Sequence, residues 1–433
     1  MQPSRRRLLL AGALLPASEL ATACLKTTAP VSLGTLAAPA RPPSVLATDE
    51  SWWAEVARQF DITDEVNHLE NGFWGAMGRS TLQAYQRHTA EVNRGNAWYG
   101  REAYPAAYRA AHADAGRLLG VAEDELVFTR GATEALLALI GGYNRLRPGD
   151  QVLHADTDYD SMIDAMQWLR SRRAVQVEGI ALPPVPTHDQ VMQAYADAFA
   201  RLPRLKLVLL TQVSHRHGLV IPVAEISALA RARGIDVIVD AAHGFGQLAY
   251  AVPDLQADFV GINLHKWIGA PVGVGAVYVR RGRVADIDPY MAVKDDGRIF
   301  SRVHTGTANF AAYLALPDAI ALHERIGIAN KRARLLALRN RWVAAARDMP
   351  HIELLASQDD AQASALASFR LRGKAGKADN QALQQRLLKQ FGIFTTARDG
   401  LASGSCVRVT PSLFTGMQQM DRLVAALEQL QRG

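Results

Sequence analysis

Short apolar runs alternate with longer helical patterns between residues 126 and 279, and this alternation constrains the fold more than any other feature. Several runs contain consecutive β-branched residues, which is typical of strands buried on both faces of a parallel sheet. Helical segments such as 223–233 lie between the runs, so the pattern predicts an α/β domain with right-handed crossovers. The seven predicted strands are 126–129, 151–155, 174–180, 206–211, 235–240, 259–264 and 275–279.

The remaining chain predicts a second, smaller domain. With 433 residues and 49% hydrophobic content, the chain is too long for one simple core. Residues 49–120 look helical, and amphipathic stretches at 311–349 and 380–391 flank a strand-like segment at 365–372, which predicts an α+β domain. The predicted division is an N-terminal segment packing with the small domain (49–75), a large domain with a mainly parallel seven-stranded sheet (76–305) and a small C-terminal domain (306–433).

The first 48 residues have the pattern of an export signal and a linker. Arg5, Arg6 and Arg7 precede an apolar run at 10–15 and a small-residue site at 21–23, which predicts a signal peptide over 1–23. The run is too short for a stable membrane span. The paired arginines followed by leucines resemble a twin-arginine signal, and an ordinary Sec signal or a chance basic start is the alternative.

Cleavage of such a signal would leave a periplasmic bacterial protein that has used the twin-arginine export machinery. Cys24 would then be the new N-terminus, but Ala21 is a poor residue three positions before a lipidated cysteine, so lipoprotein anchoring is disfavoured. Residues 24–48 are rich in Ala, Pro, Thr and Ser, which predicts a flexible linker without structure.

Charge and cysteine content exclude several classes of protein. The formal net charge is +6, yet charged residues make up only 21% and no basic block follows Arg7. This composition indicates a mildly basic soluble enzyme with no nucleic-acid partner. The two cysteines, Cys24 and Cys406, have neither the number nor the spacing of a metal site or a disulfide framework.

In open parallel sheets, ligands bind at the carboxyl ends of the strands. Gly131 and Thr133 follow the first predicted strand and open a helix, where free N–H groups and a positive dipole end favour a phosphate. The turn lacks the lysine of a P-loop, which argues against a nucleotide-binding module. The alternative is a plain N-cap at Thr133.

Two charged residues follow two other predicted strands. Asp240 ends an apolar run, where burial is costly unless a cation pairs with the carboxylate. The protonated pyridine nitrogen of pyridoxal 5'-phosphate (PLP) is such a cation. Lys266 also follows an apolar run, and as an imine on PLP it would lose its charge and tolerate burial. A structural ion pair and a lysine snorkelling at the sheet rim are the alternatives, but the joint pattern predicts a PLP enzyme.

These segments carry a family resemblance. Residues 130–134, 240–243, 265–266 and 304–307 resemble the class V aminotransferase family, in its isopenicillin-N-epimerase-like and cysteine-desulfurase-like branch. The segment 304–307 is especially similar to the epimerase-like members, and the resemblance covers roughly 60–430. It implies a PLP-dependent transferase of fold type I, a homodimer with active sites at the subunit interface, and a PLP-binding role for 76–305.

The resemblance also implies roles for individual residues. Lys266 would hold PLP as a Schiff base and Asp240 would pair with the pyridine nitrogen. Tyr159 would stack on the electron-poor ring. His243 and His215 would contact the ring hydroxyl, although the family more often has Asn or Ser at position 215. The residues implied at the phosphate are Ala132, Thr133, His265, Asn263 in place of a frequent serine, and Thr307 from the neighbouring subunit.

Arg408 is the predicted substrate-binding residue. A guanidinium binds a carboxylate through a bidentate fork, and family members carry an arginine in a similar run at the substrate α-carboxylate. A surface arginine on a strand is the alternative. Asn71 resembles the family's N-terminal lining of the substrate pocket. Cys406 lies two residues before Arg408, in a strand rather than on a mobile loop, which disfavours a desulfurase.

The sequence therefore predicts an exported PLP enzyme acting on the amino group or α-carbon of an amino acid or a peptide-linked amino acid. Lys266, Asp240, Tyr159 and His243 are the predicted catalytic residues. Transamination and epimerisation both remain open. The alternatives are a periplasmic enzyme that tailors siderophore side chains, such as those of pyoverdine, a cysteine desulfurase or lyase, and a non-catalytic protein of the same fold.

Overall fold

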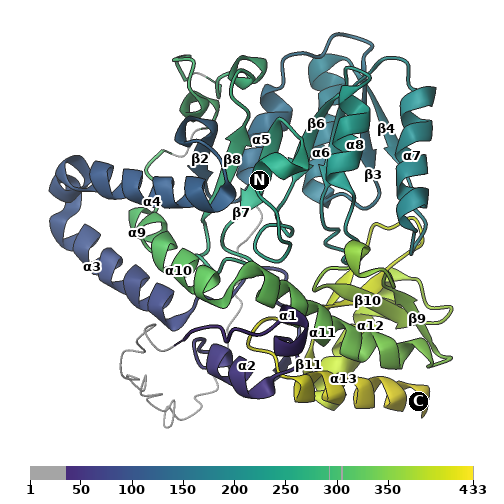
Figure 1. The fold of residues 1–433 in the computed structure, drawn as a ribbon. Helices are drawn as coiled ribbons and strands as arrows, with labels where there is room; N and C mark the ends of the chain where they lie inside the picture. The colour runs from purple at the N-terminus through teal and green to yellow at the C-terminus, as the bar shows by residue number, and fades with distance from the viewer. Residues whose placement is uncertain (1–35, 292, 304–305, 433) are drawn as a thin grey trace, which may run out of the picture. The chain divides into compact units, whose positions relative to one another are not determined.

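The structure is a computed structural model that describes residues 36–291, 293–303 and 306–432. A seven-stranded sheet forms the centre of its larger part (Figure 1). Five neighbouring strands pair in parallel, and β8 runs antiparallel to both of its neighbours. This confirms the predicted mainly parallel sheet. The spatial order is β2 (Leu126–Thr129), β8 (Gly275–Val279), β7 (Phe259–Asn263), β6 (Asp236–Asp240), β5 (Leu205–Thr211), β3 (Gln151–Ala155) and β4 (Gln176–Ile180).

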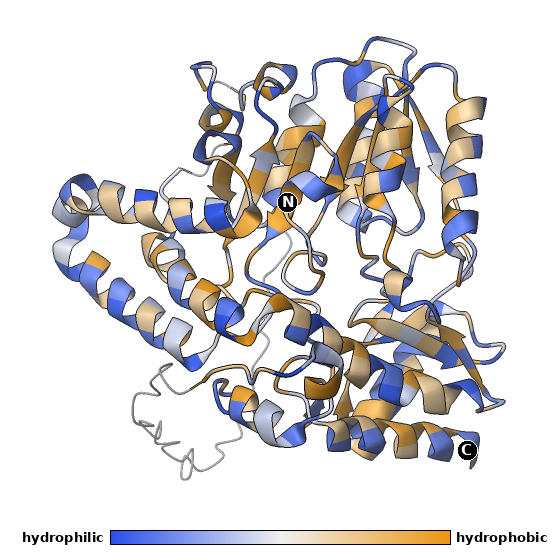
Figure 2. Ribbon diagram, in the orientation of Figure 1, coloured by the Kyte–Doolittle hydropathy of each residue, from blue (hydrophilic) through white to orange (hydrophobic). Residues whose placement is uncertain are grey.

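Helices bury both faces of this sheet. Side chains alternate along each strand: Ile238 packs with one core cluster, whereas Val237 and Val239 pack with the other. Because both clusters exclude water, the strands read as continuous apolar runs (Figure 2). One face is covered by α5 (Ala132–Gly142) and α6 (Asp160–Arg173), and the other by α4 (Tyr104–Leu119), α7 (His188–Arg201) and α8 (Val223–Arg231).

A four-stranded antiparallel sheet forms the core of the C-terminal part. Its order is β12 (Thr396–Arg398), β13 (Cys406–Val409), β10 (Ala367–Leu371) and β9 (Ile352–Leu355). The predicted strand at 365–372 corresponds to β10, whereas β9 and β12 were not predicted. The helices around this sheet are α11 (Ile328–Arg347), α12 (Lys377–Phe391) and α13 (Met417–Gln429).

The long amphipathic stretch at 311–349 is three helices rather than one. Pro317 stands in the first turn of α10 (Leu316–Ile326), and Gly327, with a φ of 82°, separates α10 from α11. Proline suits a first turn and glycine suits a left-handed φ, so both residues mark helix boundaries. Helix α9 (Phe310–Leu314) and α10 pack beside α3 (Arg79–Glu102).

The described N-terminal residues are ordered, so the predicted linker is wrong over 36–48. Residues Pro43–Leu46 form helix α1, which lies on α11. Leu36 and Leu46 are buried in one apolar cluster with Trp53 of α2 (Glu50–Ala57), and this tertiary burial outweighs the linker-like composition. Strand β1 (Asn67–His68) then pairs in parallel with β11 (Ile393–Phe394). The predicted signal peptide and residues 24–35 lie outside the described residues.

No described helix combines the length and the apolar character that crossing a bilayer requires. Across the same residues, no group of three or more His, Cys, Asp or Glu side chains is arranged to hold a metal ion. The short 3₁₀ helices in the described part of the chain are η2 (Glu123–Glu125), η3 (Val252–Leu255), η4 (Val284–Asp286), η5 (Ile299–Arg302), η6 (Asp360–Gln362) and η7 (Leu430–Arg432).

Candidate active site

A cavity of about 1590 Å³ opens at the carboxyl ends of the parallel strands. Thr211 ends β5, Asp240 ends β6 and Asn263 ends β7, and all three line it. The N-terminus of α5, the residue before α6 and two arginines of the C-terminal sheet complete the wall. The chain therefore brings its predicted cofactor and substrate residues, apart from Asn71 and Thr307, to the edge of the sheet where ligands bind in this class of fold.

Lys266 lies in the turn that follows β7. Its Nζ is 2.9 Å from Nε2 of His243. The N-terminal segment packs closely on this turn: Gly75 N–H donates to the oxygen of His265 at 2.9 Å, and a Cβ at Gly75 would overlap the backbone oxygen of Lys266. Burial lowers the pKa of the Lys266 amine to about 7, against the opposing effect of Asp240. The amine is thus available in its neutral form near physiological pH.

Asp240 is a buried carboxylate with few partners. Its side chain is 3% exposed, and one oxygen accepts the Ala242 N–H at 2.9 Å. Burial raises the pKa of this carboxyl group, while the Ala242 hydrogen bond and the charge of Lys266 oppose the rise. A carboxylate held in such a place favours a cationic ligand group, and a protonated pyridine nitrogen meets that requirement.

Two predicted histidines and Tyr159 form the wall around Lys266. Burial lowers the pKa of His243 well below its usual range, and its Nδ1 has no hydrogen-bond partner among the described residues. The Tyr159 ring packs edge to face against His215, with ring centroids 5.0 Å apart. Tyr159 is about one-third exposed to the cavity, so an aromatic ligand can reach its ring.

The turn at Gly131, where a phosphate is predicted to bind, is held in place by Asn263. Asn263 Oδ1 accepts the Ala132 N–H at 2.7 Å, and a Cβ at Gly131 would lie 3.1 Å from that oxygen. The Ala132 amide is therefore already engaged, which leaves the exposed Thr133 as the more available member of that pair. The Asn263 amide nitrogen remains as a donor, so the turn suits a phosphate.

His265 can donate a hydrogen bond to a phosphate only when its ring is protonated. Its Nδ1 donates to the oxygen of Val274 at 3.0 Å, and burial lowers its pKa to about 4. In the neutral ring Nε2 then carries no proton and cannot donate. A phosphate dianion beside the ring would favour protonation, so the implied contact with His265 couples phosphate binding to uptake of a proton.

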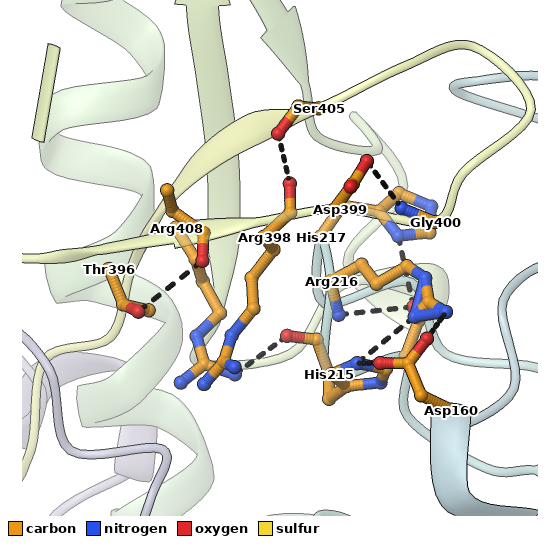
Figure 3. A network of polar contacts seen from close by, with 12 residues as sticks. Asp160, His215, Arg216, His217, Thr396, Arg398, Asp399, Gly400, Ser405 and Arg408 are labelled. Atoms are coloured by element: carbon orange, nitrogen blue, oxygen red, sulfur yellow. Dashed lines mark hydrogen bonds and ion pairs between the residues drawn. The ribbon is translucent and has the colours of Figure 1, made fainter. Parts of the chain in front are cut away.

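The predicted substrate arginine is fully buried and already paired. Arg408 donates to both oxygens of Glu70 at 2.5 and 2.8 Å, and to the oxygen of His215 at 2.6 Å. Arg398 lies 3.6 Å from the same carboxylate, so one Glu70 holds two guanidinium groups that line the cavity. Figure 3 shows the side chains of the two arginines, which come from neighbouring strands of the C-terminal sheet. Two cations and one anion leave a net positive charge, which suits one substrate carboxylate.

Two predicted contacts are not seen in this structure, and one residue was missed. Asn71 does not line the cavity, because its amide donates to the oxygen of Thr410 at 2.9 Å, and Gly72 lines it instead. Thr307 is exposed and lies outside the lining, so its role in a neighbouring subunit stays a prediction. Arg398 was missed because nothing in its local sequence separates it from a surface arginine.

The low pKa of Lys266 predicts how the protein takes up PLP. Only a neutral amine attacks an aldehyde, so capture of PLP by the cofactor-free protein should rise with pH and level off above about 7. The rate of growth of the visible absorbance, measured by rapid mixing between pH 5.5 and 9, checks this. A rate that keeps rising towards pH 10 would show that the amine has the pKa of an exposed lysine.

Comparison with known proteins agrees with this geometry. The family profile for class V aminotransferases matches residues 79–409. Isopenicillin N epimerase of Streptomyces clavuligerus is 26% identical over 87% of this chain and 98% of its own. A probable cysteine desulfurase of Xylella fastidiosa (strain Temecula1) is 28% identical over 79% of this chain and 84% of its own.

Solved structures show the same fold. The cysteine desulfurase CsdA from Escherichia coli superposes with a TM-score of 0.74 at 20% identity, covering 88% of this chain and 98% of that one. A C-DES mutant with glycine covalently linked to its PLP cofactor gives 0.73 at 22% identity, covering 86% and 98%. With the profile spanning most of the sequence and the fold in agreement, the chain belongs to the class V aminotransferase family.

Proposed function

We propose that this class V enzyme binds PLP at Lys266 and acts on the amino group or α-carbon of an amino acid, as a transaminase or an epimerase. The proposal rests on one observation. A single cavity contains a lysine with a lowered pKa, a buried aspartate and two arginines that share one glutamate and so keep a net positive charge. Lys266 and Asp240 would hold the two ends of the cofactor ring system. Arg408, with Arg398, would bind the substrate carboxylate.

The chain's own groups can manage the proton at the α-carbon. Bound PLP supplies an electron sink for the α-carbon of an attached amine. Lys266, with a pKa of about 7, can take and return a proton near neutral pH, as a general base should. His243 Nε2 lies 2.9 Å from Lys266 Nζ and orients the amine. Asp240, kept anionic by a cation, would hold the pyridine nitrogen protonated.

The environment of Cys406 argues against a desulfurase, although relatives carry that name. Desulfurases need a thiolate nucleophile. Cys406 is fully buried in β13, and burial raises the pKa of its thiol to about 11. The other cysteine, Cys24, falls in the predicted linker, outside the described residues. A thiol in this state favours amine or α-proton chemistry over sulfur transfer.

Incubation of the purified protein with a panel of L- and D-amino acids tests the proposal. We expect a shift in the visible spectrum and either a keto acid or the opposite enantiomer as product. Cys406→Ala should match wild type within about threefold, because the buried thiol does not line the cavity. Sulfide release from cysteine that disappears in Cys406→Ala would contradict the proposal and identify a desulfurase.

A second candidate is an enzyme that tailors a peptide-linked amino acid, as in siderophore side chains. The predicted export signal supports this candidate, because it would deliver the enzyme to the periplasm, where such tailoring of siderophores takes place. Under this candidate, kcat/KM should be higher for peptide-linked amino acids than for free ones. No mass change in the siderophore precursor of the host bacterium would eliminate it.

We also propose that the protein forms a homodimer. Several large apolar side chains that line the cavity are exposed, as expected for a face covered by a second subunit. They are Leu137, Trp168, Tyr290 and Met291, with exposed fractions between 42% and 86%. Sedimentation equilibrium should give twice the chain mass, and a monomer that keeps full activity would contradict this part.

We also propose export to the periplasm through the twin-arginine pathway, which rests on the sequence at Arg5 and Arg6. That pathway carries folded proteins, which suits an enzyme that loads PLP in the cytoplasm. Replacing both arginines with lysine should retain the protein in the cytoplasm of a bacterial host. Fractionation that finds the variant in the periplasm would contradict this pathway.

A further inference from the structure

The turn that carries Lys266 is held by two segments that lie far from it in the sequence. The backbone oxygen of His265, the residue before Lys266, accepts the Gly75 N–H at 2.9 Å. The backbone oxygen of Trp267, the residue after it, accepts a hydrogen bond from Nζ of Lys331 at 2.6 Å. The carbonyl groups of both neighbours of the cofactor lysine are therefore tied to segments outside the turn.

Lys331 is buried at the start of α11 without a carboxylate beside it. Its side chain is 2% exposed, and burial lowers the pKa of its amine to about 7. In the described part of the chain the amine has two polar partners, the oxygen of Trp267 and Nδ1 of His323 at 2.9 Å. Both the ammonium and the neutral amine carry N–H groups, so the contact with the Trp267 oxygen is available in either protonation state. Because lysine is rarely buried unpaired, this placement calls for a role.

The contacts of Lys331 are with the turn and not with the cavity. Lys331 is not among the residues that line the cavity, whereas Lys266 is. Trp267 is 8% exposed, and a buried carbonyl without a partner is costly, so the amine of Lys331 supplies a hydrogen bond that the turn needs. The turn is also closely packed at Gly246, whose φ is 90° and where a Cβ would lie 2.9 Å from the Cβ of Trp267.

We propose that Lys331 is a positioning residue for the cofactor lysine. By holding the carbonyl of Trp267, it fixes the turn and so determines where the Lys266 amine lies in the cavity. A general base must lie within hydrogen-bond reach of the proton that it moves, and a displacement of about 1 Å caused far from the chemistry can lower a rate about 10²-fold. The inference rests on the proposed PLP enzyme, because Lys266 needs exact placement only if it holds the cofactor and moves the proton.

The first experiment replaces Lys331 with methionine in the PLP-loaded protein. Methionine fills a similar volume but donates no hydrogen bond, so the Trp267 carbonyl loses its partner. We expect kcat to fall about tenfold and KM to stay within about twofold, because the substrate arginines are untouched. The circular dichroism of the visible band should lose amplitude, because that signal depends on how the protein orients the bound cofactor.

Two further variants separate positioning from general support of the fold. Lys331→Gln keeps an N–H donor on a shorter side chain, so the carbonyl has to move towards α11 to keep the contact, and kcat should lie between wild type and Lys331→Met. The matched control is Arg334→Met on the same helix. Arg334 is 1% exposed and donates to the oxygens of Ala47 and Thr415, each at 3.0 Å, rather than to the turn. The control should lower stability to urea but leave kcat and the visible dichroism as in wild type.

The possible results distinguish this inference from the proposed function. Equal kcat and equal visible dichroism in wild type and Lys331→Met would overturn the inference, and so would an Arg334→Met variant with the same losses as Lys331→Met. If Lys331→Met does not fold, Lys331→Gln decides the question: a lower kcat with reduced dichroism supports the inference, and wild-type values overturn it. Wild-type protein that shows no visible band with PLP would instead contradict the proposed function.

Discussion

Replacing Lys266 with alanine is expected to lower turnover by about 10²–10⁴-fold, because the cavity loses both its attachment point for the cofactor and its general base. Within the described residues, Lys266 is the lysine that lines the cavity, and its pKa of about 7 suits both roles. Steady-state rates with the best amino acid from the panel measure the loss. The variant should also lose the visible absorbance that wild type shows with bound PLP.

A second buried lysine provides an internal control for this assignment. Lys331 on α11 is 2% exposed, and burial lowers its pKa to about 7 as well. Its Nζ donates to the oxygen of Trp267 at 2.6 Å and lies 2.9 Å from His323 Nδ1, outside the cavity lining. Borohydride reduction of the PLP-loaded protein should therefore label Lys266 and not Lys331. A label on Lys331, found by peptide mass analysis, would contradict the site.

Arg408→Met is expected to lower kcat/KM by about 10²–10³-fold, because a desolvated, bidentate contact with the substrate carboxylate is lost. The same change should destabilise the fold by about 3–5 kcal/mol, since it removes the closest partner of the buried Glu70 carboxylate. Urea unfolding and steady-state kinetics measure the two effects separately.

Two further variants separate stability from substrate binding. The double variant Glu70→Gln with Arg408→Met should recover most of the stability, because the buried charge is removed, yet it should remain as poor a catalyst as Arg408→Met. Arg398→Met should have smaller effects on both, because its guanidinium is more exposed and 3.6 Å from Glu70. A double variant with restored kcat/KM would show that Arg408 only supports the fold.

The local sequence pattern was sufficient to predict the strands of the central sheet. Strands buried on both faces need unbroken apolar runs, and each of the seven runs became a strand within one or two residues of its predicted ends. The edge strand β12 escaped prediction because its three residues, 396–398, are only half-buried and carry no apolar run. The structured segment at 36–48 was not predicted because its structure depends on burial against distant helices.

The residues of the site also fall into two groups, those that the local sequence predicted and those that it did not. Lys266, Asp240 and the turn at Gly131 were predicted because each follows a strand, and the ends of parallel strands meet at one edge. The pairing of Glu70 with Arg408 joins residues that are 338 positions apart, so no local pattern encodes it. The same is true of the amide of Asn71, which the structure commits to Thr410.

The sequence by itself therefore determined the sheet and the cofactor residues carried on it, because side-chain alternation and strand ends are properties of short segments. Only the tertiary structure decided which carboxylate holds the two arginines before substrate arrives. That property depends on contacts of a few ångströms between Glu70 and Arg408 of β13, which exist only after the chain has packed.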